Sequence, residues 1–326
     1  MIEFEKPRIV ISKCIEFDHC RYNAQMISSD FVKKLKPHVD FLPVCAEVEI
    51  GLGVPRDPIR IIIDKGVKRL IQPNTDKDVS DLMNNFSNSF LNSLKEVDGF
   101  ILKSQSPSCG LRDVKIYPAS KNAAPVYRES GFFGEQVIKK FKYYAIEDEN
   151  RLRNPIIHEH FLRKIFTFSR FRKIKKLNSF KDLITFHTEN KFLLISYNQK
   201  ELKELGNILA NQNQKSKNEV FLEYENHLFQ AFQKNSRCNS NINVLQHMMG
   251  YVSSEISSEE KKFYLDLLDK FRNGQIPLSA PVNLLRSWAI RYNQKYLLSQ
   301  TYFQPYPDEL LDVETINACG IRDFWK

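Results

Sequence analysis

Three cysteines share a position that supports metal or cluster chemistry, shortly after a stretch predicted to be a buried strand. They are Cys14 after Ile9–Lys13, Cys45 after Phe41–Val44, and Cys109 a few residues after Phe100–Lys103. The carboxyl ends of strands in a parallel sheet meet at one edge, where cofactors bind. The three thiols would then converge on one site. Free cysteine is also a common core residue, and no CxxC pair is present, so the spacing alone leaves three unrelated core thiols open.

The first half of the chain has to supply the elements that bring these cysteines together. Short apolar runs alternate there with amphipathic stretches, a pattern typical of α/β domains. The predicted strands are 8–12, 39–44, 67–71, 99–103 and 114–117, and the predicted helices are 28–36 and 78–97. Alternating strands and helices predict a mainly parallel, Rossmann-like sheet in an N-terminal domain of residues 1–150.

The second half, residues 151–326, lacks this alternation and predicts an all-α domain. Helical spacing covers 156–175, 179–211, 217–234, 258–272 and 283–300. A polar connector, Glu147–Asn150, precedes this half, and Pro155 lies near the first turn of its first helix. A chain of 326 residues is long for a single core, which also favours two domains.

The composition is that of a globular protein, with 42% hydrophobic and 27% charged residues. No apolar run reaches the roughly 18 residues that a membrane-spanning helix needs, and the N-terminus lacks the pattern of a signal peptide. We therefore expect a cytoplasmic protein without a membrane partner. Thiols stay reduced there, so the six cysteines are better interpreted as ligands, catalytic groups or core residues than as a disulfide framework.

The net charge of +9 belongs almost entirely to the second half. Residues 1–150 hold 22 Lys and Arg against 21 Asp and Glu, a net of +1, and residues 151–326 hold 26 against 18, a net of +8. A basic excess of this size favours a polyanionic partner for the second half.

The stretch Arg163–Lys176 contains seven basic residues and no acid. They are Arg163, Lys164, Arg170, Arg172, Lys173, Lys175 and Lys176. Phenylalanines interleave with them, so an ordinary amphipathic helix with solvated charges is one interpretation. The absence of acids favours contacts to phosphates, and we predict that these residues bind RNA.

The cysteines stand in three longer motifs. These are Ser12-Lys-Cys14 with Cys20-Arg-Tyr-Asn23, Pro43-Val-Cys45-Ala-Glu47 running on to Arg56, and Leu102-Lys-Ser-Gln-Ser106-Pro-Ser-Cys109-Gly110. In this order they resemble the TudS family of thiouracil desulfidases, over roughly residues 7–145. The second half resembles the YbgA-like domain that is found fused to the TudS domain, through Asn243–Tyr251, Ile276–Leu278 and Tyr296–Pro307. The fused form is similar to the tRNA 4-thiouridine desulfidases. Ala46 and Ala24 depart from the family pattern without removing a cysteine.

The resemblance implies a [4Fe–4S] cluster on Cys14, Cys45 and Cys109, with one iron left open. An open iron acts as a Lewis acid toward the sulfur of a thiocarbonyl. Water then replaces the sulfur by oxygen without a transfer of electrons. The other cysteines, Cys20, Cys238 and Cys319, are not expected to be ligands.

The resemblance also implies roles for two residues beside the cysteines. Glu47 would be the general acid and base, and Ser106 would position the substrate or the water. From the residues alone, structural roles are the favoured interpretation. Glu47 would be a solvated loop carboxylate or a partner for Arg56, and Ser106 would cap the turn at Pro107.

The leading hypothesis is a desulfidase of 4-thiouridine, or of another thiouridine, in tRNA, with the basic helical domain binding the tRNA. A desulfidase of free 2-thiouracil is the alternative within enzymes. An RNA-binding or redox-sensing protein that carries a cluster without catalysis is the alternative from another class.

Overall fold

The computed structural model describes residues 4–120 and 123–311, and their contacts form two compact units. One unit is Lys6–Ile165. The other contains the described residues from Phe166 onward together with residues 4–5. The division falls inside helix α5 (Pro155–Leu177), whereas the sequence predicted a domain boundary at residue 150.

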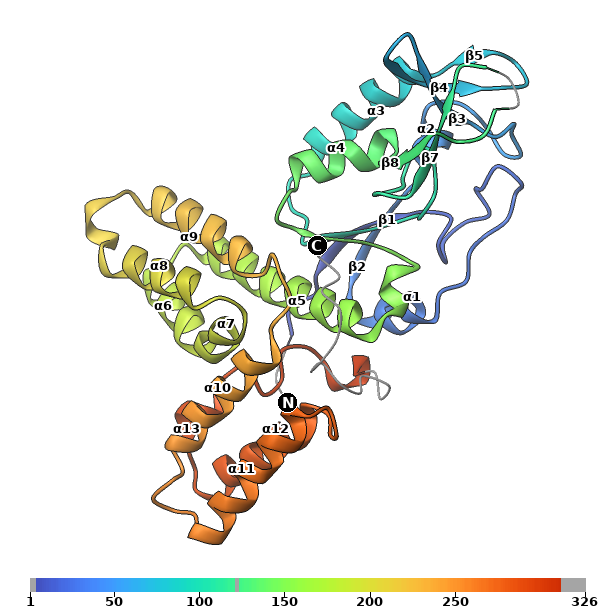
Figure 1. The fold of residues 1–326 in the computed structure, drawn as a ribbon. Helices are drawn as coiled ribbons and strands as arrows, with labels where there is room; N and C mark the ends of the chain where they lie inside the picture. The colour runs from blue at the N-terminus through green and yellow to red at the C-terminus, as the bar shows by residue number, and fades with distance from the viewer. Residues whose placement is uncertain (1–3, 121–122, 312–326) are drawn as a thin grey trace. The chain divides into compact units, whose positions relative to one another are not determined.

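The first unit is built on a four-stranded parallel sheet (Figure 1). Its strands, in spatial order, are β2 (Asp40–Val44), β1 (Arg8–Ser12), β6 (Gly99–Leu102) and β9 (Ala145–Asp148). Every neighbouring pair is parallel, so the predicted mainly parallel sheet is confirmed.

Helices cover both faces of this sheet. The core on one face joins Val10 and Phe100 to Met83 of α3 (Ser80–Ser93) and Val137 of α4 (Phe132–Lys140). On the other face, Ile165 of α5 approaches so closely that a Cβ on Gly99 would lie 3.2 Å from it. Helix α1 (Asp30–Leu35) packs there against α5, with the ring of Phe31 meeting that of Phe161.

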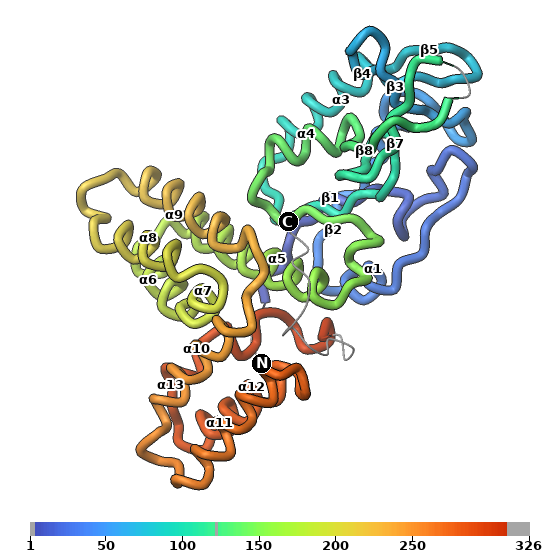
Figure 2. Tube along the Cα trace, in the orientation of Figure 1, coloured from blue at the N-terminus to red at the C-terminus, as the bar shows by residue number. Residues whose placement is uncertain are grey.

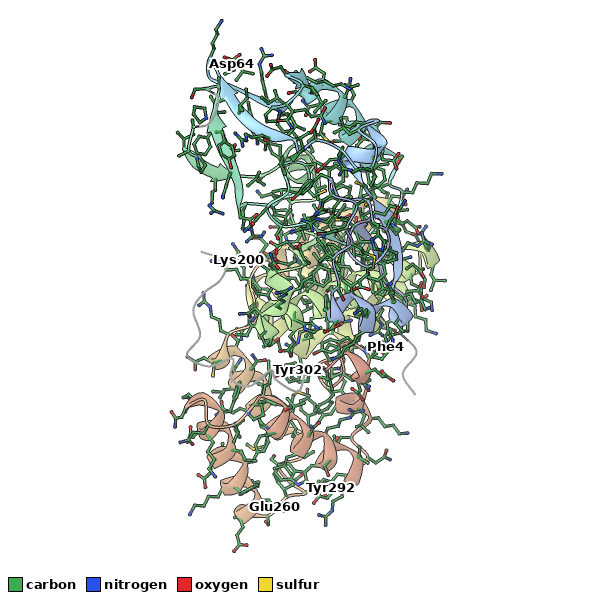
Figure 3. The ribbon with its side chains drawn as sticks, turned by 90° about the vertical axis from the view of Figure 1, so that its right-hand side faces the viewer. Phe4, Asp64, Lys200, Glu260, Tyr292 and Tyr302 are labelled. Atoms are coloured by element: carbon green, nitrogen blue, oxygen red, sulfur yellow. The ribbon has the colours of Figure 1, made fainter. Side chains whose placement is uncertain are left out.

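A second sheet of five strands belongs to the same unit. Its order is β5 (Lys77–Asp78), β4 (Val67–Gln72), β3 (Arg60–Asp64), β7 (Val114–Pro118) and β8 (Tyr127–Glu129), and only β3 and β7 are parallel. The stretches 67–71 and 114–117 are strands as predicted, but they lie in this mixed sheet. The reason is the turn after Asp64 (labelled in Figure 3): Lys65 and Gly66 have φ of 47° and 80°, which closes a two-residue hairpin.

The second unit is helical in all of its described part apart from turns, which confirms the predicted all-α region. After α5 come α6 (Phe180–Glu189), α7 (Lys191–Tyr197), α8 (Gln199–Ala210), α9 (Lys217–Ala231), α10 (Cys238–Gly250), α11 (Ser258–Arg272), α12 (Ser279–Arg291) and α13 (Lys295–Leu298). Figure 2 shows α6 to α9 gathered beside α10 to α13. Near the start of the chain, Phe4 joins this unit, its ring 5.8 Å from that of Phe166 (Figure 3).

Three features of this unit differ from the prediction. The predicted helix 283–300 is two helices, α12 and α13. The predicted helix 179–211 is three helices, because Asn190 and Asn198 end one helix and begin the next. Helix α10 was not predicted. In the described part of the chain, no helix combines the length and the apolar character needed to cross a membrane.

Candidate active site

Cys14, Cys45 and Cys109 line one cavity of about 270 Å³ at the carboxyl ends of the parallel strands. Backbone pairing sets their positions. Ser12 is in register with Val44, the amide of Lys13 donates to the carbonyl of Val44 at 2.8 Å, and the amide of Lys103 donates to Ser12 Oγ at 2.9 Å. The ends of β2, β1 and β6 are thereby held together. The sequence predicted that these cysteines would lie at one edge, and the structure places them there.

Cys20 is a fourth thiol in the same cavity. It is 3% exposed, and its side chain interacts with those of Cys14 and Cys45 closely enough to shift its pKa. Its carbonyl accepts from Cys45 Sγ at 3.8 Å and from Arg56 Nη1 at 3.0 Å. The sequence placed Cys20 outside the set of ligands, and that assignment stays a prediction.

Burial and mutual contact raise the pKa values of Cys20, Cys45 and Cys109. The contact with Cys14, together with burial, raises the pKa of Cys20 to about 11, and burial raises the pKa of Cys109 to about 12. The contact with Cys20, followed by burial, raises the pKa of Cys45 above its ordinary value. A raised pKa lowers the fraction of thiolate at Cys20, Cys45 and Cys109. Metal binding here must displace protons.

Three cysteine thiols in one cavity are a donor set of the kind that iron–sulfur clusters use. Among the residues that the structure describes, no group of three His, Cys, Asp or Glu is arranged to hold one metal ion. In a cluster each thiolate binds a different iron, so the sulfurs need not converge on a point. Cys14 and Cys109 in this cavity are 9% and 6% exposed.

Glu47 lies in the same cavity, in the first turn of α2 (Ala46–Glu49), which begins directly after Cys45. Its Oε2 accepts from Arg56 Nε at 2.9 Å and from Nη2 at 2.7 Å. Its Oε1 accepts from Ser108 Oγ at 2.7 Å and from Ser106 Oγ at 3.4 Å. The side chain is only 13% exposed, so Glu47 is not a solvated carboxylate but the partner of Arg56 within the site.

Ser106 has two sets of contacts. Its Oγ faces Glu47, and it also accepts from the amides of Cys109 at 3.1 Å and Ser108 at 3.3 Å, so it caps the turn at Pro107. Ser108 was missed by the sequence reasoning although it makes the shorter bond to Glu47. Its place directly before Cys109 in the third motif was the available signal.

The loop that carries Cys109 is docked on the first turn of α4. The amides of Phe133 and Gly134 donate to the carbonyl of Ser108 at 2.9 and 3.0 Å. A Cβ on Gly134 would lie 2.3 Å from the carbonyl oxygen of Gly110, closer than any side chain tolerates. Glycine is therefore required at 134 for this close approach.

A buried carboxylate fixes the end of β6, and the sequence reasoning did not single it out. Glu149, 5% exposed, accepts from Lys103 Nζ at 2.6 Å, from Ser104 Oγ at 2.9 Å and from the amide of Ser104 at 2.8 Å. Lys103 also lines the cavity. Glu149 thus holds a cation beside the four thiols.

The predicted RNA-binding residues of α5 are engaged with the protein. Arg163 and Lys164 are buried, at 6% and 7% exposure, and Lys164 Nζ donates to the carbonyl of Tyr144 at 2.9 Å. Phosphate contact does not fit these two, because α5 buries most of its circumference over this stretch. The remaining pairs are Arg163 with Glu159, Arg170 with Glu189, Lys173 with Glu5, and Lys175 with Glu225. RNA binding by Arg170, Arg172, Lys173, Lys175 and Lys176 stays a prediction.

Two cysteines are not among the described lining residues of the cavity, Cys238 and Cys319. The free thiols in the described part of the chain are Cys14, Cys20, Cys45 and Cys109. Cys238, which opens α10, is disulfide-bonded, so the expectation of a core or surface thiol is wrong there. Cys319 lies outside the described residues.

Comparison with known proteins matches the chain in two parts. Residues 9–149 match the family model described as 2-thiouracil desulfurase, and residues 191–307 match one described as a protein of unknown function, DUF1722. The uncharacterised protein YbbK of Bacillus subtilis (strain 168) is 32% identical over 109 residues, covering 31% of this chain and 72% of YbbK. The uncharacterised protein YbgA of Escherichia coli (strain K12) is 26% identical over 126 residues, covering 38% of this chain and 75% of YbgA.

Among solved structures, a [4Fe-4S]-dependent thiouracil desulfidase, TudS, is 23% identical. It matches 45% of this chain and 94% of its own, with a TM-score of 0.35. The family itself is shown by the sequence matches. Through residues 9–149 this chain belongs to the 2-thiouracil desulfurase family, and a DUF1722, YbgA-like domain follows that region.

Proposed function

We propose that the α/β unit is a desulfidase that replaces the sulfur of a thiolated uracil base by oxygen. The observation that carries this proposal is the meeting of Cys14, Cys45 and Cys109 with Glu47 in one cavity. The reaction converts C=S and water into C=O and hydrogen sulfide. It balances without electrons, so neither an oxidant nor a reductant is consumed.

Cys14, Cys45 and Cys109 would hold a [4Fe–4S] cluster, which when bound supplies an iron without a protein ligand as a Lewis acid for the thiocarbonyl sulfur. The chain contributes burial and a fixed frame around this group. The Glu149 network holds Lys103 at the cavity, and α4 holds the Cys109 loop in place. Both keep the cavity in shape before the substrate enters, as preorganised sites require.

Glu47 is the proton-transfer group in this proposal, and its two oxygens have separate tasks. Oε2 is bound by two nitrogens of Arg56, which fixes the carboxylate. Oε1 faces the hydroxyls of Ser108 and Ser106. A water that attacks the ring carbon would give one proton to Oε1, directly or through Ser108, and Glu47 would return that proton to the departing sulfur.

We further propose that the base is 4-thiouridine, or another thiouridine, within tRNA. The net charge of +8 in residues 151–326 supports a polyanionic substrate. A base in tRNA is stacked and has to be extruded to reach a buried cavity. Free 2-thiouracil is the second candidate, favoured by the pairing of most basic residues in α5 with carboxylates. The Glu47 network favours both enzymes over a non-catalytic cluster protein.

Isotope transfer tests the proposed chemistry. Protein reconstituted anaerobically with iron and sulfide is incubated with 2-thiouracil or thiouridine-containing tRNA in ¹⁸O-labelled water, without an electron donor. We expect each converted base to carry one ¹⁸O atom. Conversion that requires an electron donor, or that leaves the label in the water, would overturn the hydrolytic proposal.

A further inference from the structure

A second cavity of about 420 Å³ adjoins the first in the α/β unit. Its wall comes mainly from the small mixed sheet, through Arg60 of β3, Lys115 and Tyr117 of β7 and Arg128 of β8. Pro58, Ile59, Gln105 and Pro107 line both cavities. The two cavities are therefore neighbours that share one wall.

The second cavity is rich in cations that no carboxylate of the described chain neutralises. Arg60, Lys115 and Arg128 line it, and within residues 4–120 and 123–311 none of the three takes part in an ion pair. The one acid among the described lining residues, Asp113, accepts from the amide of Gln105 at 3.0 Å. Arg128 Nη1 donates to the carbonyl of Asp113 at 3.2 Å, which aims the guanidinium into this wall. Unpaired cations in a hollow suit a phosphate group.

An aromatic platform accompanies these cations. The guanidinium of Arg60 stacks over the ring of Tyr117, with Cζ 4.2 Å from the ring centroid. Both side chains are half-buried, so their positions are set by the sheet. Arginine planes and tyrosine rings are the groups on which unpaired bases stack in RNA complexes. Phosphate-binding cations beside a stacking platform indicate a nucleotide rather than phosphate alone.

The shared wall is held in a defined conformation. Gln105 has φ of 57°, a left-handed conformation that only a few per cent of residues other than glycine adopt. The hydrogen bond from the Gln105 amide to the Asp113 carboxylate links Gln105 to the second cavity. The next residue, Ser106, faces Glu47 in the first cavity. The wall thus lies between the first cavity and the second and contacts both.

We propose that the second cavity binds the nucleotide adjacent to the thiolated one in a polynucleotide substrate. Its base stacks against Arg60 and Tyr117, and its phosphate binds Lys115 and Arg128. This inference rests on the proposed function and deepens it, because a free base has no neighbour to fill this cavity. It places the recognition of an RNA strand on the α/β unit, beside the site of the chemistry.

The test uses the full chain and two substrates. The variants are the double charge reversal Lys115→Glu/Arg128→Glu and the platform variant Tyr117→Leu. Tyr117→Phe retains the ring, and Lys34→Glu reverses an exposed charge on α1, outside both cavities. The measurements are the affinity for an unthiolated tRNA of the same sequence, by fluorescence anisotropy over a range of salt, and kcat/KM for thiolated tRNA and for 2-thiouracil.

We expect the double reversal to weaken tRNA binding about 10-fold or more and to reduce the salt slope by about 0.7–0.9 for each phosphate that the variant no longer binds. Tyr117→Leu should weaken tRNA binding about 5- to 150-fold, the effect of losing the stacking of one base. Tyr117→Phe, which keeps the ring, should bind tRNA as the wild type does. In the double reversal and in Tyr117→Leu, the ratio of kcat/KM for thiolated tRNA to kcat/KM for 2-thiouracil should fall by a similar factor to the tRNA affinity. Lys34→Glu should match the wild type.

Three outcomes separate this inference from the proposed function. Unchanged tRNA affinity in both the double reversal and Tyr117→Leu would overturn the inference, even if tRNA is desulfurated. An equal loss in Lys34→Glu would also overturn it, because the effect would then be one of overall charge. A wild type that converts no thiolated substrate while carrying a full complement of iron would instead overturn the proposed function.

Discussion

At the scale of single residues, the site combines buried thiols with a carboxylate whose oxygens are not equivalent. Arg56 binds Oε2 of Glu47, and the hydroxyls of Ser106 and Ser108 bind Oε1. In a carboxylate exposed to solvent, water would hydrate both oxygens alike. A carboxylate fixed on one side by a guanidinium, and open to hydroxyls on the other, is arranged to exchange protons at one oxygen.

Replacing Glu47 by Gln tests this arrangement. Glu47→Gln should keep the iron content and lower kcat by about 100- to 10,000-fold, because the amide cannot accept the proton. Glu49→Gln, an exposed neighbour in the same helix, is the matched control and should leave kcat unchanged. Iron content and turnover on 2-thiouracil are measured side by side. Near-normal turnover of Glu47→Gln would reduce Glu47 to a structural partner of Arg56.

The role of Cys20 can be decided by comparing two serine variants. Cys20 contacts Cys14 and Cys45, yet we predict that it is not a ligand. Cys20→Ser should therefore retain the cluster, whereas Cys109→Ser should lose iron and inorganic sulfide after identical anaerobic reconstitution. If Cys20→Ser loses iron while the serine variant of Cys14, Cys45 or Cys109 retains it, Cys20 would be a ligand in place of that cysteine.

At the scale of elements, the site depends on how closely a loop approaches a helix. The amides that open α4 donate to the carbonyls of Pro107 and Ser108, and glycines permit the approach. These amides are the ones a helix leaves without internal partners. The helix therefore fixes the loop that carries both Cys109 and the serines of the Glu47 network.

The substitution Gly134→Ala should displace this loop. Its Cβ would lie 2.3 Å from a backbone oxygen, and overpacking of this kind typically costs about 1–3 kcal/mol. We expect a lower free energy of unfolding and a loss of iron binding. Gly206→Ala, in α8 with open space around its Cβ, should instead stabilise the protein by about 0.5–1 kcal/mol. An iron-loaded Gly134→Ala of wild-type stability would contradict the close approach.

Much of this element level was predictable from the sequence. Apolar runs bounded by turn residues identified β1, β2 and β6, and the position of a cysteine after each run identified the cavity. The mixed sheet was not predicted as a separate layer, because a strand is recognised by its side-chain pattern while its partner depends on the turn at Lys65 and Gly66. The Glu149 network was missed because it joins residues 45 or more positions apart.

The basic stretch of α5 shows the same limit. Its composition predicted seven cations that bind RNA, because the sequence alone does not show which residues of the other helices contact α5. The structure buries Arg163 and Lys164 and pairs Arg170, Lys173 and Lys175 with carboxylates from distant positions. Net charge over a domain is visible in a sequence, but the partners of each charge are set by tertiary packing.

At the scale of the whole molecule, the two units share one helix. Residues 155–165 of α5 belong to the α/β unit, and they include the buried Ile157, Phe161, Leu162 and Ile165. Ile9 is in register with Gly99, which Ile165 approaches, so this face of the sheet is completed by α5. A domain that ended at residue 150, as predicted, would lack the part of α5 that packs on this face of the sheet.

Two fragments test this division. A fragment of residues 1–165 should unfold cooperatively, whereas one of residues 1–150 should unfold at a lower urea concentration or aggregate. Each large apolar side chain removed from the core contributes about 1.5–3 kcal/mol. Circular dichroism during urea titration measures both. Equal unfolding midpoints would show that the α/β unit does not need the start of α5.

The central claim is that the cavity of Cys14, Cys45 and Cys109 removes sulfur from a thiolated base. The most direct measurement follows the thiocarbonyl absorbance of 2-thiouracil and of thiouridine-containing tRNA with anaerobically reconstituted full-length protein, while sulfide is quantified. The account predicts loss of the absorbance with one sulfide released per base, and none with Cys109→Ser. Protein that carries a full complement of iron and leaves both substrates unchanged would contradict it.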